Sequence, residues 1–183
     1  MTRLRFSVWL NPSKSEAGDL SAYGDVTFAP MDALADGLGG LDTSLEMPAI
    51  DLATGNYSYF AEGDLLIAKV TPCFENGKKA LINDLPNRIG FATSEVHVVR
   101  PNRKRVDPNY LLYLFSSAAF HTAGVASMTG AGGLRRISDN AIKDFVLPIS
   151  SLETQKAITA FLDREIGRIN HLIAKKCRSR QTR

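Results

Sequence analysis

An apolar run at residues 65–70 is the clearest strand signal in the chain. The turn pair Gly63–Asp64 precedes the run, and Pro72, which has no N–H to donate to a sheet, ends it. Asn76–Gly77 is a pair typical of hairpin turns, so residues 79–83 are expected to form the return strand. This pattern predicts a buried strand with a polar loop at its end, which is either a recognition surface or a solvated turn.

Further strands are expected where apolar and polar residues alternate or where β-branched residues gather. They are residues 4–10, 25–30, 91–100 and 145–149. The last of these is expected at a sheet edge because it contains Pro148. Residues 35–44 carry three glycines without periodicity, which predicts a loop, and residues 45–60 are expected to form turn-linked extended segments.

The first helix is predicted from its capping residues. Asp107 is a good N-cap and Pro108 suits the first helical position, so a helix is expected from there to about Gly124. Residues 125–133 are expected to form a loop that contains several glycines. A short capped turn is expected at residues 138–140.

The C-terminal helix is predicted from a long apolar stripe. Ser150 and Glu153 match a capping box, and the helical periodicity ends at Lys176. The stripe consists of Ile158, Phe161, Leu162, Ile166, Ile169, Leu172 and Ile173. It extends past what the preceding body needs, so part of it is expected to face another helix.

These elements together predict an α+β fold. A mixed, mostly antiparallel sheet is expected in residues 1–149, followed by a protruding coiled-coil-type helix at residues 150–176 for spacing or dimerisation. Residues 177–183 are expected to be a basic tail.

The composition is that of an ordinary soluble globular protein, with 44% hydrophobic and 22% charged residues. No apolar run approaches the ~20 residues that span a bilayer, and the N-terminal stretch lacks the features of a signal peptide. Cys73 and Cys177 match no metal or disulfide pattern, so a reduced, cytoplasmic setting is expected.

Charge is distributed unevenly along the chain. Residues 1–63 hold three Lys/Arg against nine Asp/Glu, whereas residues 64–183 hold nineteen against ten. The basic excess falls in clusters, which favour a polyanion as partner or are simply solvated loops.

Two features resemble parts of an enzyme but lie in the wrong context. Residues 107–110 resemble the Asp-Pro-Pro-Tyr motif of amino-group methyltransferases, and residues 130–133 resemble a cofactor-binding glycine turn. Such a turn must follow a strand directly and open a helix, whereas here a predicted helix precedes the glycines. Cys73, in a loop near lysines, is more simply a structural thiol than a nucleophile.

Five stretches, in order, resemble the specificity (S) subunits of type I restriction–modification systems. They are GDLLIAKVTPCFENGKKAL, GFATSEVHVVRP, LLYLFSSAAF, GAGGLRRIS and LETQKAITAFLDREIGRINHLIAKK. LNPSKSE near the start also resembles the opening of a target recognition domain from this family.

This resemblance implies a non-catalytic, sequence-specific DNA-binding subunit. In this family a target recognition domain reads one half of a bipartite site in double-stranded DNA, and a long helix connects it to the other half. The methyltransferase (M) subunit docks on S and brings S-adenosylmethionine, and the restriction (R) subunit of the complex uses ATP and Mg. No cofactor and no metal are therefore expected in this chain, and no membrane partner.

The chain departs from the family pattern in three ways. The family usually has two recognition domains and two long helices, whereas one of each is expected here, and its helix ends early. Ile149-Ser150-Ser151 also replaces the paired prolines common before this helix. The chain is expected to be either a half-subunit, which pairs as a homodimer on a palindromic split site, or a truncated fragment.

Residue chemistry selects the candidate DNA-binding residues. They are Lys69, Thr71, Glu75, Asn76, Lys78, Lys79, Arg135 and Arg136. The lysines and arginines are expected to contact phosphates, whereas asparagine suits adenine and glutamate suits cytosine. The acidic region 35–56 is an alternative place for the base-reading residues.

An alternative function is a protein-interaction module. In that case the apolar stripe docks on a methyltransferase, while the isolated domain holds DNA only weakly.

Overall fold

The computed structural model describes residues 1–38 and 40–181, with side chains described as far as residue 177. The structure contains two four-stranded sheets and two short strand pairs. One sheet has the order β2 (Val8–Leu10), β9 (Val96–Pro101), β6 (Leu65–Ala68) and β7 (Lys79–Leu81), and every pair in it is antiparallel. The other has the order β4 (Glu46–Pro48), β3 (Asp25–Ala29), β8 (Ile89–Ala92) and β5 (Ser58–Ala61), in which only β3 and β8 are parallel.

The short strand pairs and the helices complete the described chain. β1 (Thr2–Arg3) pairs with β12 (Val146–Leu147), and β10 (Thr129–Ala131) pairs with β11 (Leu134–Arg136). The α-helices are α1 (Ala49–Thr54), α2 (Pro108–Phe115), α3 (Ala118–Ser127), α4 (Asp139–Asp144) and α5 (Leu152–Gln181). Short 3-10 helices cover Leu4–Phe6, Lys14–Ala17, Leu20–Ala22 and Met31–Ala33. The predicted α+β class, with a mixed and mostly antiparallel sheet and a long C-terminal helix, is confirmed.

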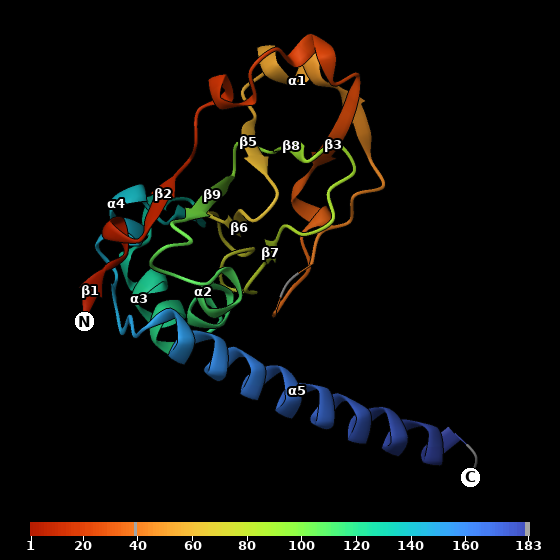
Figure 1. The fold of residues 1–183 in the computed structure, drawn as a ribbon, viewed down its shortest axis with the longest axis vertical. Coiled ribbons are helices and arrows are strands. Elements are labelled where there is room, and N and C mark those ends of the chain that lie inside the picture. The colour runs from red at the N-terminus through yellow and green to blue at the C-terminus, as the bar shows by residue number, and fades with distance from the viewer. Residues whose placement is uncertain (39, 182–183) are drawn as a thin grey trace.

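The continuous apolar pattern of β6 arises because the strand is buried on both faces. Leu65 and Ile67 pack into the core beneath α2, α3 and α4, whereas Leu66 packs into a second core that includes Phe60 and Val98. Each such side chain contributes about 1.5–3 kcal/mol when it leaves water. A third core lies beneath α1 and includes Phe91. The sheets therefore lie between the α2–α4 group and α1 (Figure 1).

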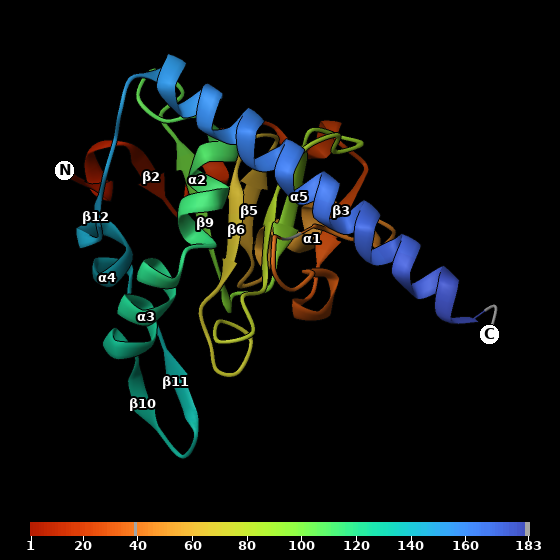
Figure 2. The same cartoon turned by 90° about the horizontal axis from the view of Figure 1, so that it is seen from below.

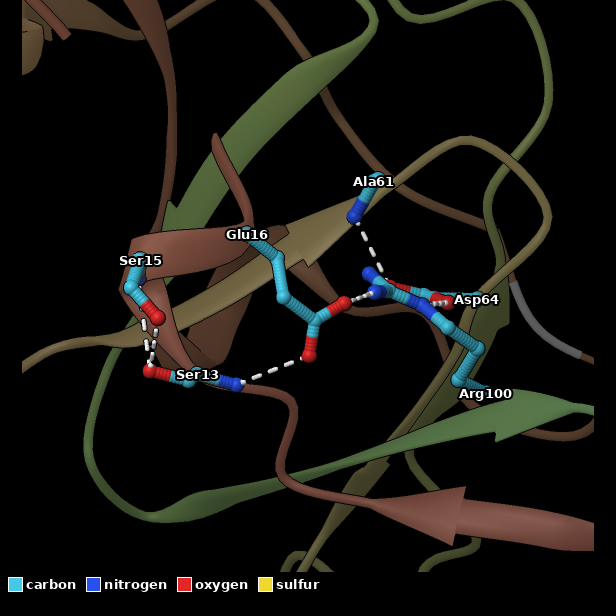
Figure 3. Close-up of polar contacts among 6 residues, drawn as sticks. All are labelled: Ser13, Ser15, Glu16, Ala61, Asp64 and Arg100. Carbon is cyan, nitrogen blue, oxygen red and sulfur yellow. Dashed lines mark hydrogen bonds and ion pairs between the residues drawn. The ribbon is translucent and has the colours of Figure 1, made fainter. Parts of the chain in front are cut away.

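A buried ion pair joins the two sheets. Asp64 lies in the turn between β5 and β6, is 1% exposed, and accepts hydrogen bonds from Arg100 Nε at 2.8 Å and Nη2 at 2.7 Å (Figure 3). Asp64 Oδ2 also accepts from the backbone N–H of Ala61 at 2.8 Å. Arg100, on β9, reaches Glu16, whose other carboxylate oxygen accepts from the Ser13 N–H at 3.2 Å. One arginine thus connects the N-terminal loop to both sheets.

The N-terminal half differs from prediction in two places. The expected strand 4–10 begins instead with a 3-10 helix at Leu4–Phe6, so only its last three residues, Val8–Leu10, are strand. The expected alternation holds at β2, where Val8 is buried and Trp9 is 57% exposed, but it is reversed before the strand, where Phe6 is 56% exposed and Ser7 is fully buried. Residues 45–60 were expected to be extended but contain α1, whose Leu52 is fully buried.

The C-terminal half differs at three boundaries. The helix expected as far as Gly124 is two helices, because Ser117 Oγ accepts from the N–H of Phe120 and starts α3. The expected loop 125–133 instead contains the end of α3 and the first strand of a hairpin. Ser151 rather than Ser150 caps α5, since its Oγ accepts from the N–H of Thr154 at 3.2 Å.

Helix α5 continues beyond its expected end at Lys176. It reaches Gln181, so part of the predicted basic tail is helical, and residues 182 and 183 lie outside the described residues. Its start is held by Gln155, which is fully buried. The Gln155 amide accepts from Asp107 N–H at 2.8 Å and donates to the carbonyls of Arg105 and Ser150, both at 2.9 Å. The helix then runs along the body, and its C-terminal part extends beyond it (Figure 2).

Replacing Arg100 with methionine should destabilise the fold strongly. The change leaves the buried Asp64 carboxylate without its charged partner, so the free energy of unfolding should fall by about 3–5 kcal/mol, measured by urea denaturation. Arg88→Met is the matched control, because Arg88 pairs with Glu62 at 3.2 Å but is 82% exposed. The control should lose at most about 1 kcal/mol. Equal small losses in both variants would contradict the assigned role of Arg100.

Candidate nucleic-acid interface

Two segments far apart in sequence form one projecting unit, here called the finger, which comprises residues 69–78 and 129–136. Figure 2 shows the loop after β6 and the β10–β11 hairpin extending from the body on the same side. Val70 bridges to Arg136, and the N–H of Thr71 donates to the carbonyl of Arg135 at 3.0 Å. At the base of the finger, the N–H of Ile137 donates to the carbonyl of Lys69 at 2.9 Å.

The hydroxyl of Thr71 fastens the hairpin to the loop. Thr71 Oγ1 donates to the carbonyl of Gly133 at 2.7 Å and accepts from the N–H of Arg135 at 3.0 Å. Gly130, at φ +145°, has no room for a Cβ, which would lie 2.2 Å from the carbonyl oxygen of Leu134. The hydroxyl of Thr71, which was predicted to bind DNA, is thus engaged with the hairpin backbone in this structure.

The loop of the finger is anchored by an aromatic side chain. Phe74 is 4% exposed and packs edge-on against Phe120, with 6.0 Å between ring centroids. Its ring lies so close to α3 that a Cβ on Gly124 would be 2.2 Å from Phe74 Cζ. The expected two-residue turn at Asn76–Gly77 is not formed as a tight hairpin, because β6 and β7 are joined by ten residues and only Gly77 of the pair has positive φ.

The two arginines of β11 are held by carboxylates. Arg135 Nη2 lies 2.7 Å from Glu75 Oε1, within the finger. Arg136 donates to both oxygens of Glu95, at 2.9 and 2.8 Å, in a bidentate pair. Both arginine side chains remain exposed, by 42% and 45%. The hydrogen bonds from Arg136 hold the pKa of Glu95 below its usual range.

The neighbouring lysines point inward rather than toward solvent. Lys78 Nζ donates to the carbonyl of Leu34 at 2.7 Å. Lys79 is 5% exposed, and its Nζ donates to the carbonyls of Gly37 and Gly77 at 2.5 and 2.9 Å. Burial lowers the pKa of Lys79. Lys79 was predicted to contact phosphate, but in this conformation its ammonium group cannot reach one, because carbonyls of two loops surround it.

The remaining predicted residues differ in exposure. Asn76 is exposed, whereas Lys69 and Glu75 are half-buried. Only the first part of the acidic region proposed as an alternative reading surface comes near the finger: the N–H of Gly40 donates at 3.3 Å to the carbonyl of Lys79, the residue that follows the finger loop, whereas α1 packs in the third core. The sequence pattern did not predict the pairing of Arg136 with Glu95, because Glu95 lies in the predicted strand 91–100, far from Arg136 along the chain.

The predicted apolar stripe of α5 lies on one face of the helix and is only partly covered by the body. Leu162 and Ile166 are half-buried and line a cavity of about 660 Å³ whose other walls include Phe74 and Phe115. The other stripe residues are 38–56% exposed: Ile158, Phe161, Ile169, Leu172 and Ile173. The Tyr113 hydroxyl, 2.5 Å from Asp163, holds this part of the helix beside α2. Within the described part of the chain nothing covers the five exposed stripe residues, which form the open face of α5.

The features that resembled enzyme motifs have structural roles here. Asp107 Oδ1 accepts from the N–H groups of Asn109 and Tyr110 and caps α2. Residues 130–133 lie in the hairpin of the finger. Among the described residues, no three His, Cys, Asp or Glu side chains are placed to hold a metal ion. No described helix is long and apolar enough to cross a membrane.

Comparison with known proteins gives one consistent family. A family model described as type I restriction modification DNA specificity domain matches residues 43–176. The chain is 36% identical over 134 residues to the type I restriction enzyme EcoAI specificity subunit of Escherichia coli. It is 30% identical over 124 residues to the EcoEI specificity subunit of the same organism. The matches cover 73% and 68% of this chain, which spans only 23% and 21% of those relatives.

Solved structures share the fold. The HsdS subunit from Thermoanaerobacter tengcongensis matches with a TM-score of 0.74 at 19% identity, over 93% of this chain and 43% of that one. The S subunit of the type I restriction–modification system from M. genitalium matches with a TM-score of 0.56 at 13% identity, over 94% and 40% of the two chains.

The histidine beneath the finger should make stability depend on pH. His97 is 2% exposed, and its Nε2 lies 3.0 Å from the carbonyl of Ile137. Burial lowers the pKa of His97 from the ordinary value of 6.5, and this outweighs the opposing effects of that carbonyl and of Asp139. The unfolded chain therefore takes up the proton first as pH falls, so stability should be complete above about pH 6.5 and decrease below it.

Urea denaturation at pH 7.5 and pH 5.5 tests this expectation. His97→Gln should show a smaller decrease than the unchanged protein, whereas His171→Gln, at an exposed position on α5, should leave the decrease unchanged. The same pH dependence in the His97→Gln variant would contradict the assignment.

Proposed function

The chain belongs to the type I restriction–modification DNA specificity domain family, and from this membership we propose that it reads one half of a bipartite DNA target through its finger. The predicted family and the predicted class of non-catalytic specificity subunit are confirmed by the matches to the family model and to the two specificity subunits. Reading of DNA, docking of other subunits and the identity of the contacting residues are part of the proposal.

The observation that carries the DNA-reading role is the build of the finger. All three residues of β10 and both ends of β11 are exposed, so the hairpin contributes little to the core. It is nevertheless fixed to the neighbouring loop by Thr71 and by a backbone bridge. A segment that is exposed yet rigidly positioned suits recognition, because a preorganised surface loses less entropy when it binds.

We assign separate roles to the residues of the finger. Arg135 and Arg136 contact phosphates, with Lys69 and Lys78 adding positive charge near the base, and this sets affinity without reading sequence. Asn76, which is exposed, reads a base edge, and adenine is its best partner. Glu75 is a second candidate reader and is paired with Arg135 in the free protein.

The exposed face of α5 serves as the docking surface in this proposal. Its partners are the methyltransferase subunit, which holds S-adenosylmethionine, or a second copy of this helix, and the restriction subunit joins through the complex. In this division residues 1–149 are the DNA-reading domain and α5 is the spacer helix. Because the chain spans less than a quarter of its curated relatives, the second half-site is read by a second domain or by a second copy.

A second candidate function is a protein-interaction module that holds DNA only weakly alone. One observation favours it: each arginine of β11 is already paired with a carboxylate, whereas the apolar face of α5 is open. The two candidates differ in whether the isolated chain binds duplex DNA.

Removing the two arginines of β11 should weaken DNA binding. For the Arg135→Ala/Arg136→Ala variant, the slope of log affinity against log salt concentration should become shallower by about 0.9 for each lost phosphate contact, measured with a labelled duplex. Arg88→Ala is the control, because Arg88 is also exposed and paired with a glutamate but lies outside the finger. Unchanged affinity and slope in the double variant would exclude the finger as the phosphate-binding surface.

A charge on the open face of α5 should abolish docking of the methyltransferase. Ile169→Asp should prevent co-purification with a co-expressed methyltransferase subunit and leave thermal stability unchanged, because Ile169 is 54% exposed. His171→Asp, on a different side of the same turn, is the control and should still co-purify. Retained co-purification of the Ile169→Asp variant would argue against this face as the docking surface.

A further inference from the structure

The finger carries more positive charge in sequence than it presents to a ligand. Residues 69–78 and 129–136 contain four Lys/Arg and one Glu, and Glu95 lies against the hairpin as a second carboxylate. The two carboxylates are bonded to the two arginines of β11. A phosphate that approaches either arginine therefore meets a guanidinium whose charge is already balanced.

We propose that Glu75 and Glu95 are internal competitors of DNA, which occupy Arg135 and Arg136 and reduce the sequence-independent affinity of the finger. This inference rests on the proposed function, since it concerns the same surface. A phosphate must displace each carboxylate or share the guanidinium with it, and the carboxylate charge opposes the phosphate in both cases. Binding to an arbitrary duplex consists almost wholly of such charge contacts, so the competitors act most directly on it.

Stability alone does not account for these pairs. Ion pairs between exposed side chains contribute about 0–1 kcal/mol to folding, and all four side chains here are 33–45% exposed. The finger is already held by the Thr71 hydroxyl and by backbone hydrogen bonds at its base. The bidentate geometry at Glu95 imitates the geometry with which arginine binds a phosphate, which makes that carboxylate an effective competitor.

The backbone of each of the two glutamates is held independently of the arginines. The carbonyl of Glu75 lies 3.0 Å from His121 Nε2 on α3. The carbonyl of Glu95 accepts from the N–H of Lys69 at 3.0 Å. Both bonds involve main-chain atoms of the glutamates, so replacing either carboxylate with an amide leaves the backbone in place. Glutamine is therefore the suitable substitution, because it has the shape of glutamate without the charge.

The test measures affinity for a labelled duplex of arbitrary sequence at several salt concentrations. The variants are Glu95→Gln, Arg136→Ala and the pair combined, with thermal melting to check that each is folded. Glu95→Gln should bind about threefold to tenfold more tightly at about 50 mM salt, with a slope steeper by about one phosphate contact. Most of this gain should disappear in the Arg136→Ala background. Glu62→Gln, whose partner Arg88 lies outside the finger, should change nothing.

Each other outcome overturns one specific statement. If Arg136→Ala weakens binding while Glu95→Gln does not strengthen it, the competitor role is wrong and the DNA-reading role stands. If Glu95→Gln gains as much in the Arg136→Ala background, a general charge effect replaces the pairing and the inference is again wrong. If neither Arg136→Ala nor Glu95→Gln alters binding, the proposed function of the finger fails. Glu75→Gln with Arg135→Ala repeats the test at the second pair.

Discussion

The buried ion pair between Asp64 and Arg100 is the constraint on which the rest of the structure depends. Asp64 lies in the turn between β5 and β6. Its carboxylate therefore fixes the point at which the chain passes from one sheet to the other. Burial of a charge is unfavourable unless the charge is paired and hydrogen-bonded, and the guanidinium of Arg100 supplies two bonds at once. The finger begins directly after β6, the strand that starts at this junction.

Helix α5 is fixed to the body at its first turn, whereas the apolar residues of its C-terminal part are exposed. Gln155 satisfies three backbone groups at its first turn, and Thr159 and Asp163 keep the next turns beside α2. Beyond that point the apolar residues no longer face the body. Exposed apolar side chains repeated along one helix face are costly for a soluble chain, and a second helix is the structure that covers such a face most effectively. A partner bound to the open face of α5 would therefore be held in a fixed orientation relative to the domain.

The sequence predicted those elements whose signals lie within a few consecutive residues. The strand β6 and the Asp107 cap of α2 were predictable because each has a signature within a few consecutive residues, a continuous apolar run and an Asp-Pro pair respectively. The hairpin of the finger was missed because its glycines are typical of a loop, and the groups that order it belong to Thr71, about sixty residues away. The burial of Lys79 was missed for the same reason, since the carbonyl of Gly37 is a long-range partner.

The basic clusters show why charge in a sequence differs from charge on a surface. A cluster such as Arg135–Arg136 predicts a polyanion site only if its side chains are free to exchange partners, and in the fold each is matched with a carboxylate brought from elsewhere. Arg100 belongs to another basic cluster, with Arg103, Lys104 and Arg105, and its side chain is hydrogen-bonded to the buried Asp64. In the proposed function, the DNA affinity of this domain depends on how a few guanidinium groups divide between carboxylates of the chain and phosphates of DNA, and tertiary structure supplies the carboxylates.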